Sequence, residues 1–248
     1  MTQHRIFLTG GSGFVASRMV EHLAHAHPDA YQVCASTTDI LSGAPLREAL
    51  AAFQPDIVLH LAAQSHVPTA FRQPELTLQV NLEGTRQLLA ALDSLAFSGT
   101  LLFVGSGDMY GLVADSALPV AEHQPLRPRN PYAASKVAAE AWCYQHSLHC
   151  AYRIVMARAF NHIGRGQSNQ FVLPAMAEQL VAIERGLRPP LLETGDLATC
   201  LALTDEKVGP TLVTNTLARL FAPKFPLRFF SIRPKIPDSD IRVVYRSN

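Results

Sequence analysis

Apolar residues in the first two thirds of the chain follow two alternating patterns. Short runs that are apolar almost throughout, as in strands buried on both faces of a parallel sheet, lie at residues 5–9, 31–36, 56–63, 100–104 and 152–160. Between them, apolar residues recur at helical spacing after residue 14 and in residues 46–53, 76–95 and 132–149. Strands that alternate with helices predict an α/β fold with a doubly wound parallel sheet of the Rossmann type.

The composition and net charge of the chain indicate which kinds of binding partner to expect. With 248 residues, of which 48% are hydrophobic, the chain can bury a full core. Its net charge of +1 gives no electrostatic reason to expect nucleic acid or a membrane surface as a partner. No apolar run in the sequence approaches the roughly 18 residues of a membrane span.

Cysteine and histidine positions bear on the compartment and on metal binding. The four cysteines are scattered without a C-x-x-C pair, which favours a reducing cytoplasm. His22, His25 and His27 cluster at the end of the first predicted helix, but no carboxylate or cysteine accompanies them at ligand spacing. We therefore expect a solvated helix end there, and no metal site.

The first strand runs into a glycine-rich turn, residues 10–13, and then into a helix. This context favours a dinucleotide site, because glycines let the backbone approach a pyrophosphate that rests on the helix N-terminus. Gly10 and Gly13 carry the pattern, and Ala16 stands at the position that packs the helix against the strand. A tight turn that holds no ligand is the alternative.

The end of the second strand bears on the kind of dinucleotide. An NAD enzyme usually has Asp or Glu there for the ribose 2′-hydroxyl, and an NADP enzyme often has an Arg nearby. Residues 35–38 read Ala-Ser-Thr-Thr, so neither signal is present. Because the missing acid removes repulsion against a 2′-phosphate, we favour NADP(H), with NAD(H) as the alternative. Asp39 follows, where an acid could meet the adenine edge.

Tyr132 and Lys136 lie four residues apart in a helix that Pro131 begins, so their side chains share a face. A Lys ammonium beside a phenol favours the phenolate and is expected to lower the pKa of Tyr132. Such a pair can pass a proton to or from an oxygen near neutral pH. The spacing alone also suits an exposed helix pair, and the remaining motifs decide between the two.

Two further strand ends bring polar residues to the edge of the sheet where ligands bind in open α/β folds. The third predicted strand ends in residues 62–66, which read Ala-Ala-Gln-Ser-His. The fourth is followed by Ser106, whose hydroxyl can donate to a carbonyl oxygen, and by the nearby acid Asp108. A serine at a strand end also commonly caps a turn, so Ser106 alone is ambiguous.

Together these motifs resemble the extended short-chain dehydrogenase/reductase family. The resemblance rests on Thr9-Gly10-Gly11-Ser12-Gly13-Phe14, Leu61-Ala62-Ala63, Asn81 with Gly84-Thr85, Ser106 followed by Tyr110-Gly111, and Tyr132-x-x-x-Lys136. A finer pattern in residues 60–67, 105–111, 126–132 and 160–167 resembles the GDP-mannose dehydratase branch of that family. The resemblance covers about residues 3–200.

The resemblance implies a role for each motif. It implies that NAD(P)H is held by Gly10, Ser12, Gly13, Phe14, Val15, Asp39, Ile40, Leu61, Ala62, Ala63, Asn81, Tyr132, Lys136 and Phe160. It implies a catalytic group of Ser106, Asp108, Tyr132 and Lys136, and substrate contacts from Ser65, Ser106, Asn161 and Gln167. The implied reaction is hydride transfer from NAD(P)H to C4 of a GDP-linked 4-keto-6-deoxy sugar, with Tyr132 protonating the oxygen.

A dehydratase of GDP-mannose, or another nucleotide-sugar epimerase or dehydratase, is the rival within the family. Related dehydratases resemble one another in having Glu where this chain has Asp108, and Gly107 offers no second carboxyl group. Asp is one methylene shorter than Glu, a difference that can misplace a catalytic base. The reductase is therefore favoured, and an inactive nucleotide-binding remnant is the other alternative.

The C-terminal part departs from the family. Residues 1–160 form the predicted dinucleotide-binding domain, and residues 161–248 form a small, incomplete substrate-binding part. Nothing from residue 206 on resembles the family, and prolines break the periodicity, so we expect a truncated or altered end. The resemblance also implies a homodimer through the helices near residues 77–95 and 132–149, where Trp142, Cys143 and Leu148 offer apolar surface.

Overall fold

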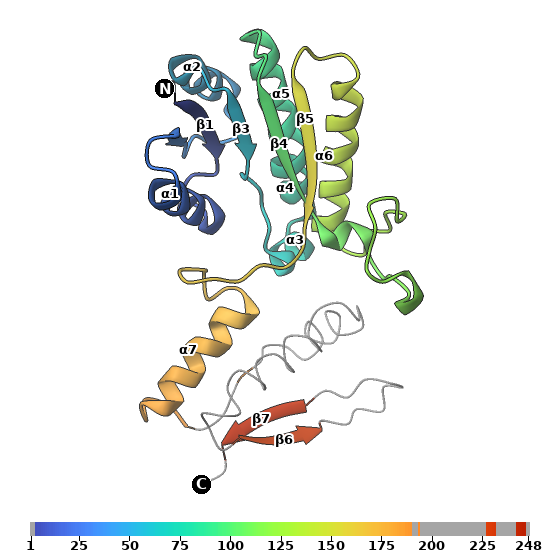
Figure 1. The fold of residues 1–248 in the computed structure, drawn as a ribbon. Helices are drawn as coiled ribbons and strands as arrows, with labels where there is room; N and C mark the ends of the chain where they lie inside the picture. Colours follow the sequence, from blue (N-terminus) through green and yellow to red (C-terminus); the bar gives the residue numbers. More distant parts are fainter. Residues whose placement is uncertain (1–2, 190–192, 194–226, 232–241, 247–248) are drawn as a thin grey trace. The chain divides into compact units, whose positions relative to one another are not determined.

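The chain forms two compact units, Met1–His162 and Ile163–Asn248. The computed structural model describes residues 3–189, 193, 227–231 and 242–246. The first unit carries a five-stranded sheet in the order β2-β1-β3-β4-β5, with every neighbouring pair parallel (Figure 1). Its strands are β1 His4–Thr9, β2 Tyr31–Ala35, β3 Ile57–His60, β4 Thr100–Ser106 and β5 Arg153–Ala159.

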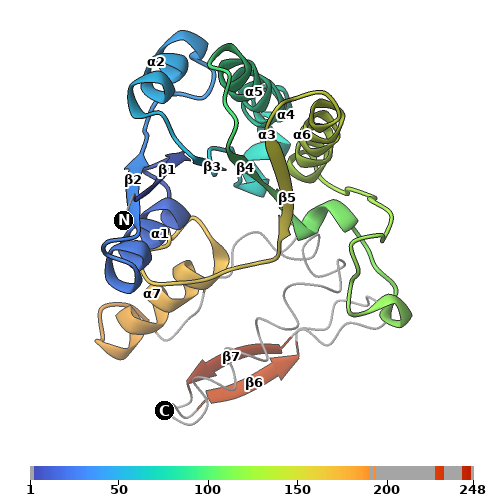
Figure 2. The ribbon, with the colours of Figure 1, turned by 45° about the horizontal axis from the view of Figure 1, so that its top comes forward.

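The sheet reverses its winding at β1, which pairs with β2 on one side and with β3 on the other. One face is covered by α1 Phe14–Ala26, and the other by α2 Gly43–Phe53, α5 Gly84–Ser94 and α6 Pro131–Ser147 (Figure 2). The doubly wound α/β fold that the apolar pattern predicts is therefore confirmed.

The core of the first unit lies in two layers, because successive side chains of a strand point to opposite faces of the sheet. Phe7 of β1 packs with Leu50 of α2 and Leu88 of α5 in the larger layer. Its neighbour Leu8 packs with Ala16 of α1 in the smaller layer. All five side chains are almost completely buried, so β1 is held from both faces.

The helix expected over residues 76–95 is present, and it contains a π-helical turn that the apolar pattern does not predict. After α3 Val67–Arg72 the chain forms α4 Pro74–Leu78, a π-helical turn η1 Gln79–Glu83, and then α5. The π turn carries Asn81, whose side chain is 1% exposed and bonds to the loop after β3 instead of extending the apolar stripe. Hydrophobic periodicity does not register such a turn, because the flanking residues keep a helical repeat.

The second unit contains one helix, α7 Val172–Glu184, and an antiparallel strand pair among its described residues. The pair joins β6 Leu227–Ser231 to β7 Arg242–Arg246 and was not expected from the sequence. Apart from these two strands, the predicted departure from the family after residue 205 lies outside the described residues. A substrate-binding role for this part of the chain stays a prediction.

The structure bears on two expectations from the sequence, the lack of a membrane span and the cytoplasmic location. Within the described ranges, no helix is long and apolar enough to cross a membrane. Cys34, Cys143 and Cys150 are free thiols. A cytoplasmic location stays a prediction.

Candidate active site

Four strand ends of the first unit meet at one edge of its sheet, because β1, β3, β4 and β5 all run in the same direction. The glycine turn follows β1, residues 61–63 follow β3, Ser106 ends β4 and Phe160 follows β5. Helix α6 begins next to β4 and places Tyr132 in its first turn. Most of the residues predicted for catalysis and cofactor binding thus come from separate elements that one sheet edge brings together.

The glycine turn has the geometry that a pyrophosphate requires. Gly10 has a positive φ of 70°, and a Cβ at this position would lie 2.8 Å from the backbone nitrogen of Ala62. Gly13 stands in an extended conformation directly before α1, and no side chain caps that helix. The N–H groups of the first helical turn therefore have no side-chain acceptor, and a phosphate could accept from them, which fits the predicted dinucleotide.

Gly11 is a residue whose role the sequence reasoning missed. Its N–H donates to the Ser36 carbonyl at 2.7 Å, and a Cβ there would collide with the backbone of Ala35. The glycine turn is thereby held against the end of β2, the position that distinguishes NAD from NADP. A third glycine directly after Gly10 was the available signal.

The other residues predicted to bind the cofactor differ in how accessible their side chains are to a ligand. Ser12 is exposed, Val15 is half-buried, and Phe14 stacks on His162 with 6.1 Å between ring centroids. The Asp39 carboxylate accepts the N–H of Leu41 at 3.0 Å. The Ile40 side chain is packed in the core, so any adenine contact there is left to its backbone.

A chain of buried hydrogen bonds runs along this edge from β1 to α6. Thr9 Oγ1 accepts the N–H groups of Leu61 and Ala62, each at 3.1 Å, and donates to His60 Nδ1 at 2.9 Å. His60 Nε2 donates to Thr85 Oγ1 at 2.9 Å, since the Thr85 hydroxyl itself donates to the Asn81 carbonyl at 2.6 Å. These directions assign one neutral tautomer to His60, and burial lowers its pKa to about 3.

Asn81 continues the chain to the helix that carries Tyr132. Its amide nitrogen donates to the Gln64 carbonyl at 3.0 Å and to Ser135 Oγ at 2.8 Å, and its oxygen accepts the Gln64 N–H at 2.8 Å. Both amide hydrogens are thus used inside the protein. The predicted cofactor contact of Asn81 stays a prediction, and the structure gives this side chain a positioning role. His60, Thr85 and Ser135 had no role in the sequence-based prediction.

Ser106 and Tyr132 form the centre of the site. The 3₁₀ turn η2 Gly107–Tyr110 begins after Ser106, whose hydroxyl oxygen accepts the Asp108 N–H at 3.2 Å. Hydrogen bonding from the same hydroxyl acts to lower the pKa of the Tyr132 phenol, which places the two groups side by side. Because a serine hydroxyl that accepts at its oxygen still carries its own hydrogen, Ser106 is placed to donate.

The expectation that Lys136 lowers the pKa of Tyr132 is wrong. Burial raises the pKa of Tyr132 above its ordinary value of 10.0, the hydrogen bond with Ser106 opposes this, and the charge of Asp108 raises it further. The Lys136 ammonium instead donates to the Val104 carbonyl at 2.9 Å and lies 5.2 Å from the centroid of the Phe103 ring. Burial lowers the pKa of Lys136 itself to about 8.

Asn130 is a further residue to which the sequence-based prediction gave no role. Its side-chain oxygen accepts the Ala133 N–H at 2.7 Å and so caps the N-terminus of α6. Its side chain also lies beside the Asp108 carboxyl group, where hydrogen bonding partly offsets the rise that burial causes in the pKa of that group. Asn130 therefore ties η2 to the first turn of α6.

The predicted substrate contacts are the least defined part of the site. Ser65 is exposed on the loop after β3, and Phe160 and Asn161 are exposed after β5. Gln167 belongs to the second unit, and its predicted contact stays a prediction. In the described part of the chain, no group of three His, Cys, Asp or Glu side chains is arranged to hold a metal ion.

Comparisons with known proteins agree with the geometry of the site. The sequence matches the NAD dependent epimerase/dehydratase family over residues 6–199. GDP-6-deoxy-D-mannose reductase of Pseudomonas aeruginosa is 48% identical over 198 residues, which are 79% of this chain and 64% of that protein. GDP-mannose 4,6-dehydratase of Vibrio cholerae is 33% identical over 153 residues, which are 60% of this chain and 40% of that protein.

A solved structure, that of RMD from Pseudomonas aeruginosa complexed with NADPH, resembles this one with a TM-score of 0.71. The two sequences are 45% identical, and the match covers 75% of this chain and 65% of that one. The chain therefore spans slightly less than two thirds of the length of these Pseudomonas relatives.

The lowered pKa of Lys136 predicts a pH dependence of stability. Between about pH 8 and 10.5 the folded protein releases a proton that the unfolded chain keeps, so the free energy of unfolding should rise with pH. Compared with Lys136→Met, wild type should gain up to ~1.4 kcal/mol per pH unit across that window. Urea unfolding of both proteins as a function of pH measures the difference in their free energies of unfolding. The titration of Tyr132, which has the opposite effect on stability, is common to both proteins and cancels in that difference. Parallel curves would show that Lys136 titrates normally.

Proposed function

We propose that this chain, which belongs to the NAD dependent epimerase/dehydratase family, reduces the 4-keto group of GDP-4-keto-6-deoxy-D-mannose to GDP-D-rhamnose with NAD(P)H. The observation that carries the proposal is the placement of the Ser106 hydroxyl beside the Tyr132 phenol, at the sheet edge that also holds a glycine turn with an uncapped helix N-terminus. Similarity to GDP-6-deoxy-D-mannose reductase over 79% of the chain supports the choice of sugar.

In this proposal Tyr132 is the general acid. Its raised pKa keeps the phenol protonated at neutral pH, which is the form that can give a proton to the sugar oxygen. Ser106 donates a second hydrogen bond to the same oxygen, and Lys136 contributes positive charge one helical turn away. A bound nicotinamide would supply the hydride to C4, so that one hydride and one proton complete the reduction.

We propose NADPH as the preferred cofactor. Strand β2 ends at Ala35 without an acid, and the Ser36 and Thr38 hydroxyls that follow are hydrogen bonded to each other at 3.0 Å. A 2′-phosphate would therefore meet no like charge on these residues and could accept from the Thr38 hydroxyl, because the Ser36 hydroxyl donates to Thr38. The similarity to a Pseudomonas aeruginosa structure complexed with NADPH supports the same choice.

A dehydratase is less well supported. Elimination of water across C5–C6 needs a base for the C5 proton and an acid for the leaving hydroxyl group. Gly107 offers neither, and a Cβ there would lie 2.8 Å from the Phe160 ring. Asp108 is the one carboxyl group in η2.

The substrate test distinguishes the two reactions. With GDP-4-keto-6-deoxy-D-mannose, purified protein should oxidise NADPH at least as efficiently as NADH, because the end of β2 carries no acid. With GDP-mannose it should form no 4-keto product, because η2 lacks a second acid–base group. Cofactor absorbance and product chromatography measure both reactions, and saturable NADPH binding in a fluorescence titration is the control for a folded site. Formation of the 4-keto sugar from GDP-mannose would overturn the assignment.

Three variants separate the roles in the proposed chemistry. Tyr132→Phe keeps the ring but removes the proton donor, so kcat should fall by about 10²- to 10⁴-fold or more with NADPH affinity nearly unchanged. Ser106→Ala should reduce kcat less, because one of two hydrogen bonds to the oxygen remains. Lys136→Ala should also weaken NADPH binding, since the family resemblance implies a ribose contact. Steady-state kinetics and cofactor titrations compare them, and a Tyr132→Phe enzyme with most of its activity would place the chemistry elsewhere.

We also propose a homodimer formed through α5 and α6. Trp142 and Leu148 at the C-terminal part of α6 are 41% and 61% exposed, and Trp142 lies across to α5 with the Arg86 guanidinium 4.6 Å from its ring centroid. Cys143, which was expected to add to this surface, is fully buried, so that part of the expectation is wrong. An exposed Trp beside an Arg is typical of an interface centre.

Light scattering at micromolar concentration tests the dimer. Wild type should have the mass of two chains, and Trp142→Glu should shift it toward one, because a charge would be buried in the interface. Leu112→Glu changes an equally exposed apolar residue outside these helices and should leave the mass unchanged. A wild-type monomer would rule out the proposal.

A further inference from the structure

The ion pair of Arg158 and Glu140 joins β5 and α6 to η2, the proposed catalytic turn, and to the loop that contains Glu122. Arg158 of β5 donates from Nε to both carboxylate oxygens of Glu140 on α6, each at 3.1 Å, and from Nη2 to Oε1 at 2.6 Å. Its Nη1 donates to the Tyr110 hydroxyl and to the Glu122 carbonyl, each at 2.9 Å. A planar guanidinium can make all of these bonds at once, and a lysine cannot.

The pair is too well buried to be an ordinary surface contact. The Arg158 and Glu140 side chains are 22% and 9% exposed. A carboxylate that is buried this deeply is stable only beside a cation held in a fixed position. The buried Glu140 carboxylate therefore holds the Arg158 guanidinium in place. Glu140 lies one helical turn after Lys136, on the part of α6 that faces the sheet.

Tyr110 connects the pair to the catalytic turn. The Arg158 guanidinium lies 5.1 Å from the centroid of the Tyr110 ring, and the Phe160 ring stacks on that ring at 6.3 Å between centroids. Tyr110 is the last residue of η2, and Ser106 immediately precedes that turn. Held at its hydroxyl by Arg158 and at its ring by Phe160, Tyr110 fixes one end of the turn.

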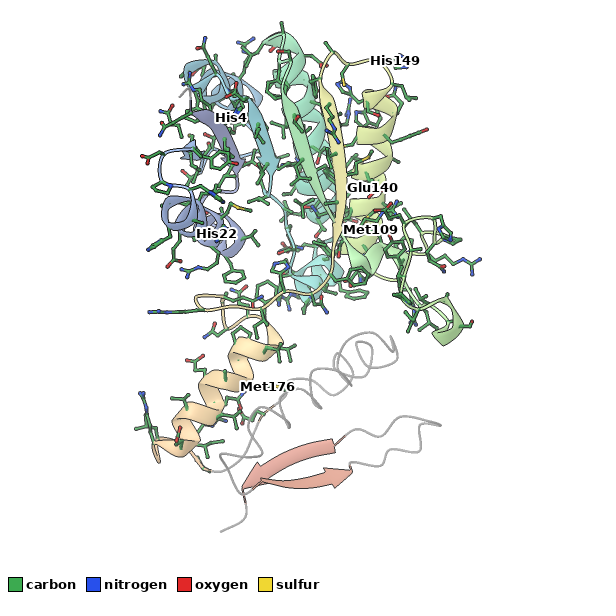
Figure 3. All side chains as sticks on the ribbon, in the orientation of Figure 1. His4, His22, Met109, Glu140, His149 and Met176 are labelled. Carbon is green, nitrogen blue, oxygen red and sulfur yellow. The ribbon has the colours of Figure 1, made fainter. Side chains whose placement is uncertain are left out.

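The space between the ion pair and the turn is filled. The Ser106 N–H donates to Met109 Sδ at 3.3 Å. A Cβ at Gly105 would lie 3.0 Å from Met109 Sδ and 3.3 Å from Glu140 Oε2, and Figure 3 labels Met109 and Glu140 close together near the end of β4. Because close-packed interiors transmit displacement, a shift of Arg158 or Tyr110 is expected to move the turn.

We propose that Arg158 is a positioning residue: by clamping Tyr110 against Glu140, it fixes the turn that presents Ser106 and Asp108 to Tyr132. The proposal deepens the proposed reductase function and rests on it for the kinetic part of its test. The bond from Arg158 to the Glu122 carbonyl extends the same control to the loop before Asn130, which holds Asp108 from the other side.

The decisive variant is Tyr110→Phe, compared with Tyr152→Phe. Both tyrosines are buried. The Tyr110 hydroxyl forms a hydrogen bond with the Arg158 guanidinium, and the Tyr152 hydroxyl forms one with the His146 ring. Tyr110→Phe should lower kcat by about 10- to 100-fold with NADPH affinity unchanged, because only the Ser106 turn is displaced. Tyr152→Phe should lower thermal stability without changing kcat. Arg158→Lys should behave like Tyr110→Phe.

A second measurement does not depend on turnover. Tyrosine labelled with carbon-13 at Cζ reports the Tyr132 phenol by NMR, and the signal missing from Tyr132→Phe identifies it. Tyr110→Phe should shift that signal and raise the pKa of Tyr132 further, because the hydrogen bond with Ser106 lowers that pKa in wild type. Tyr152→Phe should leave both unchanged.

The outcomes separate the two proposals. A wild-type protein without reductase activity would refute the proposed function, and the Tyr132 signal would still test the clamp. A Tyr110→Phe protein with wild-type kcat and an unmoved Tyr132 signal would overturn the positioning role of Arg158. Equal effects of Tyr110→Phe and Tyr152→Phe on kcat would do the same, since they would reflect stability alone.

Discussion

Polar side chains buried at the carboxyl edge of the sheet must find hydrogen-bond partners within the protein, and this requirement organises the site. His60 satisfies both ring nitrogens with Thr9 and Thr85, and Asn81 passes the chain on to Ser135 of α6. Each group has one compatible direction of donation, so the glycine turn, the loop after β3 and the helix of Tyr132 hold each other in one arrangement. A neutral His60 with a pKa of about 3 keeps that arrangement across the physiological pH range.

Burial also decides the protonation states on which the proposed chemistry depends. It raises the pKa of Tyr132 and lowers that of Lys136, so a protonated phenol lies one turn from a lysine that loses its charge near pH 8. A protonated phenol is suited to giving a proton to an oxygen as hydride arrives at the adjacent carbon, which is the direction of a reductase. Proton abstraction by a phenolate would need the opposite shift. The raised pKa is therefore consistent with the role that the proposed reduction assigns to Tyr132.

The sequence was sufficient to predict those parts of the fold and the site in which a local pattern corresponds to one structure. Apolar runs alternating with helical periodicity predict the parallel sheet, and the turn between Gly10 and Gly13 predicts an uncapped helix start. It was insufficient where contacts are long-range. The partner of Lys136 is the backbone of Val104, 32 positions earlier in the chain, and the spacing of Tyr132 and Lys136 contains no trace of it. The ion pair of Glu140 and Arg158 likewise depends on tertiary packing, which no local window records. The cap from Asn130 to the Ala133 N–H is local, and an Asn directly before Pro131 was the available signal for it.

The central claim is that the site at this edge delivers a hydride to C4 of the sugar while Tyr132 supplies the proton. It is tested most directly by following the hydrogen that is transferred. NADPH carrying deuterium at the transferable position of the nicotinamide would be incubated with GDP-4-keto-6-deoxy-D-mannose, and the product examined by NMR and mass spectrometry. The account predicts one deuterium per product molecule, bound to C4 of the sugar. A product without deuterium, or with deuterium at another carbon, would contradict it.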